Sequence, residues 1–260
     1  MMKILLSNDD GYFAPGIQML FTTLQQEIQF QSLVIMAPER NRSAASNSLT
    51  LLEPLRLHSH SVPNDAENCL IYSVNGTPTD CVHIGVNGGL GCQPDIVISG
   101  INAGANMGDD VIYSGTVAAA TEGRFLGKPS IAVSLCGDQH FATAAHVLVN
   151  FLKQMPSMTL NRDTIININV PDIPLEALKG VKVTRLGKRH ASEPVVKQND
   201  PRGLPVYWIG PAGRASDGGE GTDFHAVESG YASITPLKID LTHYEMMNQL
   251  SDWADNFRIL

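Results

Sequence analysis

Several patterns that would reveal a function at once are missing from this chain of 260 residues. Its four cysteines form no C-x-x-C pair and its eight histidines fall into no H-E-x-x-H pattern, which argues against a zinc site of these kinds. The thiols are therefore expected to be reduced and structural, in a cytoplasmic protein. The dinucleotide fingerprint G-x-G-x-x-G and the Walker pattern G-x-x-x-x-G-K-[ST] are absent as well.

Positive charge and long apolar runs are also scarce. The 18 Lys and Arg residues face 26 Asp and Glu, which gives a formal net charge of −8 and argues against a broad nucleic-acid-binding surface. A small phosphorylated substrate stays open, because a metal can supply positive charge locally. No apolar run approaches the ~18 residues of a membrane span, and no segment resembles a signal peptide. With 43% hydrophobic residues, the composition suits a soluble globular protein.

The first two thirds of the chain alternate between strand-like runs and helical stripes. Strands are expected at 3–7, 32–37, 70–74, 96–99, 131–135 and 165–170, and helices at 16–28, 77–86, 114–126 and 142–152. This alternation predicts an α/β fold in which helices cover both faces of a mostly parallel sheet.

The last third changes character. We expect strands at 181–187, 206–210 and 231–237, an irregular glycine-rich stretch at 212–222, and a terminal amphipathic helix at 242–256. These elements look more like hairpins than βαβ units, so they are expected to form a small lobe or an arm that reaches another subunit. The chain is thus predicted to be a single unit, with a core over about 1–180 and an extension over about 181–260.

The most informative pattern is the pair Asp9 and Asp10, which follows directly on the apolar run 3–7. In an open α/β sheet, ligands bind at the edge where the strands end. Two adjacent carboxylates repel each other there unless a cation joins them, and hard cations such as Mg²⁺ prefer oxygen ligands. One Asp would equally suit a helix cap, but two of them before Gly11 favour a metal site.

Three further polar segments follow predicted strands or open the next helix. They are the loop 37–48, the stretch 99–110 with Asn102 and Asn106, and the helix start at Ser114, Gly115 and Thr116. Free backbone N–H groups and the helix dipole make a helix start suitable for an anion. Taken singly, the three segments are explained equally well as a surface loop, a glycine-rich turn and an N-cap. Their convergence on the end of the first strand is what favours a common site.

These segments resemble the SurE family of survival proteins, which are metal-dependent 5′/3′-nucleotidases. The likeness covers nearly the whole chain, with motifs at 7–11, 14–16, 37–43, 76–80, 99–104, 113–119, 167–171 and 231–237. Ala105 stands where some relatives carry proline, and we expect little consequence. The resemblance implies a Rossmann-like three-layer core and a C-terminal hairpin and helix extension that is exchanged between the subunits of a homodimer. A tetramer of two such dimers is equally compatible.

The resemblance also implies a site and a reaction. The reaction is the hydrolysis of nucleoside monophosphates, and in some members of short polyphosphate, with one divalent ion, Mg²⁺ or Mn²⁺, in each subunit. Asp9 and Asp10 are expected to be catalytic. The implied metal ligands are Asp9, Asp10, Ser43 and Asn102, and the implied phosphate-binding residues are Asn106, Ser114, Gly115 and Thr116.

Three other interpretations stay open at this point. Asp9 could be a nucleophile that forms an aspartyl phosphate, although haloacid-dehalogenase-type phosphatases carry Asp-x-Asp rather than adjacent aspartates. The chain could be a non-catalytic nucleotide-binding module, which leaves the paired aspartates unexplained. A purely structural assembly protein would explain the terminal arm but not the polar cluster. The preferred base and the physiological metal do not follow from the sequence.

Overall fold

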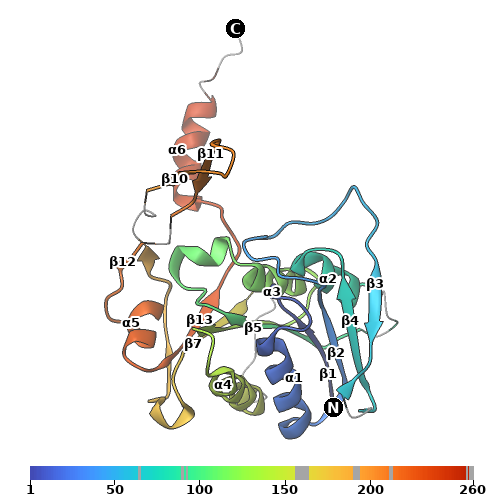
Figure 1. Cartoon of the computed structure of the whole chain (residues 1–260). Helices are drawn as coiled ribbons and strands as arrows, with labels where there is room; N and C mark the ends of the chain where they lie inside the picture. Colours follow the sequence, from blue (N-terminus) through green and yellow to red (C-terminus); the bar gives the residue numbers. More distant parts are fainter. Residues whose placement is uncertain are drawn as a thin grey trace.

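The structure is a computed structural model that describes residues 1–63, 66–88, 91, 93–155, 164–189, 194–210, 213–255 and 257. Within these residues nine strands form one sheet, in the order β3-β4-β2-β1-β5-β6-β7-β13-β8 (Figure 1). The strands are β1 Met2–Ser7, β2 Phe30–Pro38, β3 Leu57–His60, β4 Cys69–Val74, β5 Ile96–Ala103, β6 Ser130–Cys136, β7 Ile165–Pro171, β8 Val181–Val183 and β13 Ala232–Leu237.

The centre of the sheet is parallel. Strands β4, β2, β1, β5, β6 and β7 run side by side in the same direction, and the edge strand β3 pairs antiparallel with β4. The central strands are buried almost throughout, as expected of parallel strands that are covered on both faces. The predicted α/β fold with a mostly parallel sheet is confirmed.

Helices cover the two faces of the sheet, as α1 Pro15–Glu27, α2 Pro78–Val86, α3 Gly115–Phe125 and α4 Phe141–Gln154. On β1, Ile4 and Leu6 belong to the core that contains α1 and α4, whereas Leu5 packs with residues of α2 and α3. This alternation follows from the two-residue period of a strand. Helix α2 begins with a full capping box between Thr77 and Asp80, as its sequence suggests. The four predicted helices are confirmed.

Strand β5 is longer than predicted. The expected strand ended at Ser99, but β5 continues to Ala103 after a register shift against β6 between Ser99 and Asn102. Gly100 has a φ of +139°, and a Cβ on it would lie 2.3 Å from the carbonyl oxygen of Val133, so only glycine fits. The glycine interrupts the apolar pattern without ending the strand. Asn102 therefore lies on the strand rather than in a loop.

The last third joins the main sheet and also leaves it. Strand β13 pairs antiparallel with β7, and β8 pairs parallel with β13. The remaining elements of this third are β9 Lys188–Arg189, β10 Val196–Asn199, β11 Pro205–Trp208, β12 Ala215–Asp217, α5 Asp223–Glu228 and α6 Tyr244–Asp255. Two short 3₁₀ helices, η2 Gly108–Ile112 and η4 Leu175–Ala177, lie earlier in the chain. Strands β10 and β11 form a hairpin, in keeping with the hairpin character expected of this region, although no strand was predicted at Val196–Asn199, and β9 pairs with β12.

Several expectations for this region were wrong in detail. The strand predicted over 181–187 ends at Val183, and a separate short strand, β9, follows at Lys188–Arg189. The stretch 212–222 contains β12, and α5 was not anticipated. Ala212 and Asn256, at the ends of the predicted irregular stretch and terminal helix, lie outside the described residues, as does Cys92. The three described cysteines, Cys69, Cys81 and Cys136, are free thiols.

Helix α6 and the β10–β11 hairpin stand away from the sheet (Figure 1). Helix α6 buries none of its residues, although Met246, Leu250 and Trp253 lie along it. None of the helices in the described part of the chain combines the length and the apolar character needed to cross a membrane.

Candidate active site at the ends of β1 and β5

The predicted site residues meet at the edge where β1 and β5 end. Strand β1 lies between β2 and β5, so the chain winds outward from β1 in both directions. Ligands bind at such a switch point in open α/β sheets. The first turn of α1 closes against this edge, since a Cβ on Gly16 would lie 1.9 Å from the carbonyl oxygen of Ile101 in β5. The loop between β1 and α1 is thereby held over the ends of both strands.

Asn8 shapes that loop. Its amide nitrogen donates to the carbonyl oxygen of Gly11 at 2.9 Å, and its Oδ1 accepts the Gly11 N–H at 3.2 Å. Gly11 has a φ of +106°, which glycine adopts at little cost. The fully buried Asn8 therefore fixes the turn that carries the two aspartates. We missed this role in the sequence, although an Asn three residues before a glycine is a turn signal.

Asp9 is buried against the start of α3. Its Oδ1 accepts the hydroxyl of Thr116 at 2.5 Å, and the N–H of Gly115 also donates to this carboxylate. A Cβ on Gly115 would lie 2.6 Å from the Cβ of Asp9, so the close approach needs glycine. Burial raises the pKa of Asp9, the Thr116 hydrogen bond opposes that rise, and the charge of Asp10 adds to it.

Asp10 is half-buried and reaches β5 and the loop after β2. Its Oδ2 accepts the N–H of Ala103 at 3.0 Å, and its Oδ1 accepts the amide of Asn41 at 3.3 Å. Burial raises the pKa of Asp10, and the hydrogen bond from Ala103 works against that rise. Asp10 therefore connects three segments that lie far apart in the sequence.

The loop after β2 brings Ser43 to this edge through Asn41. The N–H and the hydroxyl of Ser43 donate to Asn41 Oδ1 at 2.7 and 2.6 Å, while the N–H of Arg42 donates to the carbonyl oxygen of Asp9 at 2.7 Å. The Arg42 guanidinium points elsewhere and donates to the carbonyl oxygen of Asn75. Asn41 was not among the predicted site residues, yet it joins Ser43 to Asp10.

Asn102 lies beside the Asp10 contact, one residue before Ala103. Its amide nitrogen donates to the carbonyl oxygen of Gly104 at 2.8 Å, which leaves Oδ1 as its acceptor. In the described part of the chain, no hydrogen bond joins Ser43 or Asn102 directly to either aspartate. The structure thus gathers the four predicted metal ligands at one edge, with Ser43 and Asn102 reached through Asn41 and Ala103.

The predicted phosphate-binding residues fall into two groups. Ser114 caps α3 by accepting the N–H of Val117 at 3.1 Å, and Gly115 and Thr116 contact Asp9 as described above. Asn106 lies in the loop after β5, and none of its hydrogen bonds among the described residues goes to Ser114, Gly115 or Thr116. Its amide nitrogen donates to the hydroxyl of Ser134 at 2.8 Å. The helix start therefore supports the carboxylate pair in this structure, in addition to any contact with an anion.

Asn106 is fixed by two asparagines of β7 that belong to the 167–171 motif, although no role for them was predicted from the sequence. Its backbone N–H donates to Asn169 Oδ1 at 2.8 Å, and its carbonyl oxygen accepts the amides of Asn167 and Asn169, both at 2.9 Å. Both β7 residues are fully buried. Two Asn residues two positions apart on a buried strand face the same side, and this is the signal that could have identified them.

A divalent cation fits the donors at this edge. Asp9 and Asp10 are adjacent and both are withdrawn from water, yet none of the ion pairs among the described residues involves them. Nor do three His, Cys, Asp or Glu side chains gather to hold a metal anywhere in the described ranges. A metal bound to the two aspartates would therefore complete its shell with neutral oxygens, for which Ser43 Oγ and Asn102 Oδ1 are suited.

Comparisons with known proteins agree along the whole chain. The family described as "Survival protein SurE" matches residues 4–193. The 5′-nucleotidase SurE of Hydrogenovibrio crunogenus is 67% identical over 255 residues, 98% of this chain and 99% of the relative, and the 5′/3′-nucleotidase SurE of Proteus mirabilis is 55% identical over 259 residues, 100% and 98%. The crystal structure of SurE from Aquifex aeolicus matches with a TM-score of 0.81 and 44% identity, covering 96% of this chain and 99% of that one. The chain belongs to the survival protein SurE family.

Proposed function

We propose that the protein is a metal-dependent nucleotidase that hydrolyses nucleoside 5′-monophosphates to nucleoside and phosphate. The observation that carries this proposal is the adjacent pair of the buried Asp9 and the half-buried Asp10 at the switch point of the sheet, next to the start of α3. Relatives that are named 5′-nucleotidase SurE match nearly the full chain. One relative is named 5′/3′-nucleotidase, so 3′-monophosphates, with short polyphosphate, are included as further substrates.

The chain's own residues divide the work. Asp9 is buried and held by Thr116 and Gly115, so it serves as the fixed anchor of the metal. Asp10 is more accessible, and we assign to its carboxylate the orientation of the attacking water and the acceptance of its proton. Ser43 and Asn102 complete the protein's share of the shell as neutral ligands. The neutral ligands keep the site positive enough to attract a phosphate.

The metal is a divalent ion, and we propose one Mg²⁺ or Mn²⁺ per subunit. When bound, it supplies positive charge that polarises the phosphoryl oxygens and acidifies a water molecule. Asn106, Ser114, Gly115 and Thr116 would bind the phosphate from the opposite side. The start of α3 favours an anion there, because its first N–H groups and its dipole point toward the site.

Phosphate release tests this function directly. The protein is stripped with EDTA and reloaded with Mg²⁺ or Mn²⁺, and phosphate release is measured from the 5′-mononucleotides, from 3′-AMP and from short polyphosphate. We expect activity with 5′-mononucleotides only in the reloaded protein. Asp9→Asn is expected to lower kcat/KM by at least about a hundredfold, since even residues behind metal ligands cost 10–100-fold when changed.

Asp95→Asn is the matched control for that variant. Asp95 accepts the N–H of Lys3 at 2.8 Å near the start of β1, at the opposite edge of the sheet, so its loss should leave kcat/KM unchanged. Nucleotide binding without metal-dependent turnover in the wild type would instead favour the non-catalytic module. A phosphorylated Asp9 peptide, trapped by rapid quenching with labelled substrate, would favour the aspartyl phosphate route over direct attack by water.

We also propose that the extension assembles the chain into a homodimer or into a tetramer of two dimers. Helix α6 exposes Met246, Leu250 and Trp253, and the β10–β11 hairpin exposes Tyr207 and Trp208, so both present apolar side chains that another subunit would cover. Light scattering coupled to gel filtration tests this. Trp253→Asp should shift the mass toward the monomer, whereas Met19→Asp, a change of an exposed apolar residue on α1, should not.

The finer assignments of place and organisation follow the same proposal. We place the protein in the cytoplasm, since its described cysteines are free thiols, which suits a reducing compartment. We treat residues 1–260 as one unit, because β13 of the extension pairs with β7 of the core. Fractionation of cells and a single cooperative unfolding transition would bear on these two points. The proposed partners are nucleoside monophosphates, with neither nucleic acid nor membranes among them.

A further inference from the structure

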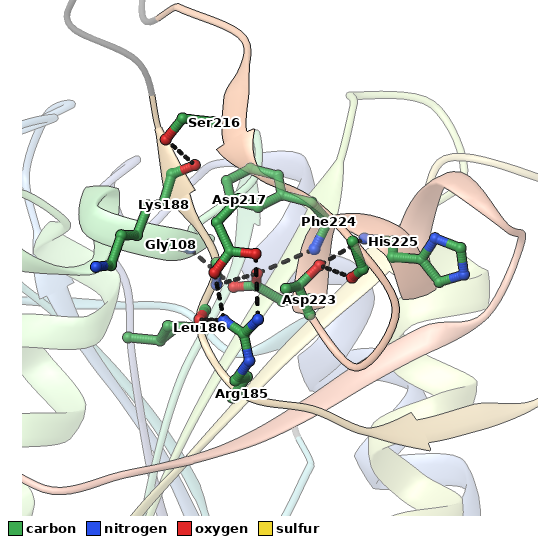
Figure 2. A network of polar contacts seen from close by, with 12 residues as sticks. Gly108, Arg185, Leu186, Lys188, Ser216, Asp217, Asp223, Phe224 and His225 are labelled. Atoms are coloured by element: carbon green, nitrogen blue, oxygen red, sulfur yellow. Dashed lines mark hydrogen bonds and ion pairs between the residues drawn. The ribbon is translucent and has the colours of Figure 1, made fainter.

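A buried carboxylate outside the proposed catalytic pair holds three backbone N–H groups. Asp223 is fully buried, its Oδ2 accepts the N–H of Gly108 at 2.8 Å, and its Oδ1 accepts those of Gly187 at 2.9 Å and Phe224 at 3.0 Å. Figure 2 shows Asp223 within this network, near Phe224 and linked to Gly108. A buried charge with such partners is a strong and directional constraint.

These donors join two parts of the molecule that are distant in sequence. Gly108 begins η2, two residues after Asn106, and η2 leads to Ser114 at the start of α3. Asp223 and Gly187 belong to the extension. We call residues 106–114 the phosphate segment, because it carries Asn106 and Ser114 of the proposed phosphate site. One side chain of the extension therefore holds the middle of the phosphate segment.

The contact is closely packed as well as hydrogen-bonded. A Cβ on Gly108, whose φ is +55°, would lie 2.7 Å from Cε2 of Phe224, and a Cβ on Gly187 would lie 2.5 Å from Cδ2 of the same ring. The two glycines let the Phe224 ring, itself buried, lie directly against both backbones. Movement of the phosphate segment away from the extension would therefore break packing and a charge-assisted hydrogen bond together.

Arg189 adds a second attachment on the same side. Its Nε donates to Asp110 Oδ2 at 2.5 Å, its N–H donates to Asp109 Oδ2 at 3.0 Å, and its guanidinium lies 4.9 Å from the centre of the Phe224 ring. Both aspartates belong to η2. The extension thus contacts η2 at Gly108, Asp109 and Asp110.

The core holds the other end of the phosphate segment through Asn167 and Asn169, which bind the backbone of Asn106 as described above. The segment is thereby fixed between β7 and the extension. We propose that Asp223 is a positioning residue, which sets the placement of Asn106 and Ser114 for phosphate and makes the extension part of the substrate site. This inference rests on the proposed function of the 106–114 residues.

Asp223→Asn tests the inference with almost no change of shape. Asparagine has one acceptor oxygen, so its NH₂ group would face either the Gly108 N–H or the N–H groups of Gly187 and Phe224. We expect KM for AMP and the inhibition constant of inorganic phosphate to rise together, by on the order of tenfold to a hundredfold. A misplacement of binding groups by about 1 Å has an effect of this size. Hydrogen exchange should also become faster in peptides that cover 106–114.

Asp217→Asn is the matched control within the same network. Asp217 forms the ion pair with Arg185 at 2.6 Å (Figure 2), but it makes no hydrogen bond to the described 106–114 residues. An exposed pair of this kind contributes little, so KM, phosphate inhibition and exchange over 106–114 should match the wild type. Phe224→Leu, which keeps the carboxylate and loosens only the packing on Gly108, should raise KM in the same direction by a smaller factor.

The inference is overturned if folded Asp223→Asn has wild-type KM and phosphate inhibition, even with a lowered Tm, because Asp223 would then be merely structural. If Asp223→Asn does not fold, KM and phosphate inhibition of Phe224→Leu are measured in its place, and wild-type values would overturn the inference in the same way. A wild type that releases no phosphate from any nucleotide refutes the proposed function instead. In that case, wild type and Asp223→Asn are compared by hydrogen exchange over 106–114 and by the affinity of each protein for inorganic phosphate. These two measurements still decide whether Asp223 positions this segment.

Discussion

Two loops at the same edge of the sheet place an aspartate just after a buried parallel strand, and they treat it in opposite ways. Asp172 directly follows β7, and its oxygens accept the N–H groups of Asp138, Gln139 and His140, with the His140 ring at 2.8 Å. Asp9, after β1, has the Thr116 hydroxyl, the Gly115 N–H and its own N–H, with the charge of Asp10 beside it.

The difference appears in the pKa values. Burial works to raise the pKa of Asp172, but the N–H and the ring of His140, with the N–H groups of Asp138 and Gln139, outweigh it and hold the pKa below its ordinary value. For Asp9 burial wins and the pKa is raised. A position at the edge therefore does not define a metal site. Asp9 differs in being deeply buried with too few donors to offset that burial, and a carboxylate in such a position favours a neighbouring cation.

Each aspartate lies directly against a glycine, and substitution of the glycine beside Asp9 is expected to have the largest effect on activity. A Cβ on Gly115 would lie 2.6 Å from the Cβ of Asp9, and one on Gly137 would lie 2.1 Å from Asp172 Oδ2. Gly115→Ala should displace Asp9 and lower kcat/KM with AMP by about a hundredfold, the cost of a displacement near 1 Å.

Gly137→Ala serves as the counterpart in the same assay. It should lower the Tm, because Asp172 must shift away from its donors, while kcat/KM stays within about threefold of the wild type, well below the cost of displacing a catalytic group. Equal losses of activity in the two variants would mean that the two loops do not differ in function as the comparison states.

Thr116→Val gives the next largest effect and separates two roles for this residue. Valine keeps the branched shape but removes the hydroxyl that donates to Asp9 Oδ1 at 2.5 Å. We expect the affinity for Mn²⁺, measured by calorimetry, to fall about tenfold or more, as for other residues that orient a metal ligand. If phosphate inhibition weakens while the affinity for Mn²⁺ is unchanged, Thr116 binds the phosphate rather than orienting Asp9.

Asp172→Asn should act on stability instead of activity. Loss of the charge from a group that accepts several N–H bonds should reduce the free energy of unfolding by about 1–3 kcal/mol at pH 7. Because the folded pKa is lowered, this stability is present above the unfolded pKa of about 3.9 and is lost as the pH falls through the lower folded value. Urea titrations at pH 7 and in acid should show the difference from wild type shrinking as the pH falls.

The sequence was sufficient for the parts of the molecule that local patterns determine. The stripe Ile17, Leu20 and Leu24 defines α1, and the capping box of Thr77 and Asp80 defines the start of α2. It also indicated the β1 loop as a candidate site, since two adjacent carboxylates after a strand are unusual without a cation. These features depend on residues within a few positions of one another.

The features that were missed depend on contacts across the fold. Asn167 and Asn169 gain their role only when β7 lies near the loop after β5, and Asp223 gains its role when α5 reaches Gly108 across 115 positions of sequence. The end of β5 was misplaced because Gly100 resembles a strand end unless the neighbouring backbone of Val133 is known. Tertiary pairing of this kind leaves no periodic signal in a single sequence.

Cys136 gives the smallest effect and reports on the charge of Asp172. Burial, with the charges of Asp223 and Asp172, raises the pKa of Cys136 to about 12, so at pH 8.5 its thiolate is roughly a thousandfold scarcer than for an ordinary thiol of pKa about 8.5. Alkylation by iodoacetamide, followed by mass spectrometry, should be correspondingly slow. Asp172→Asn should speed it about twofold to tenfold by moving the whole pH–rate curve to lower pH, whereas Asp217→Asn should not. At pH values far below 12, a lower thiol pKa and easier opening of the loop both raise the rate by a factor that does not depend on pH, so hydrogen exchange over residues 136–140 is measured as well. Faster exchange there in Asp172→Asn would indicate easier opening of the loop, and the electrostatic contrast between the two edge aspartates would then lose this support.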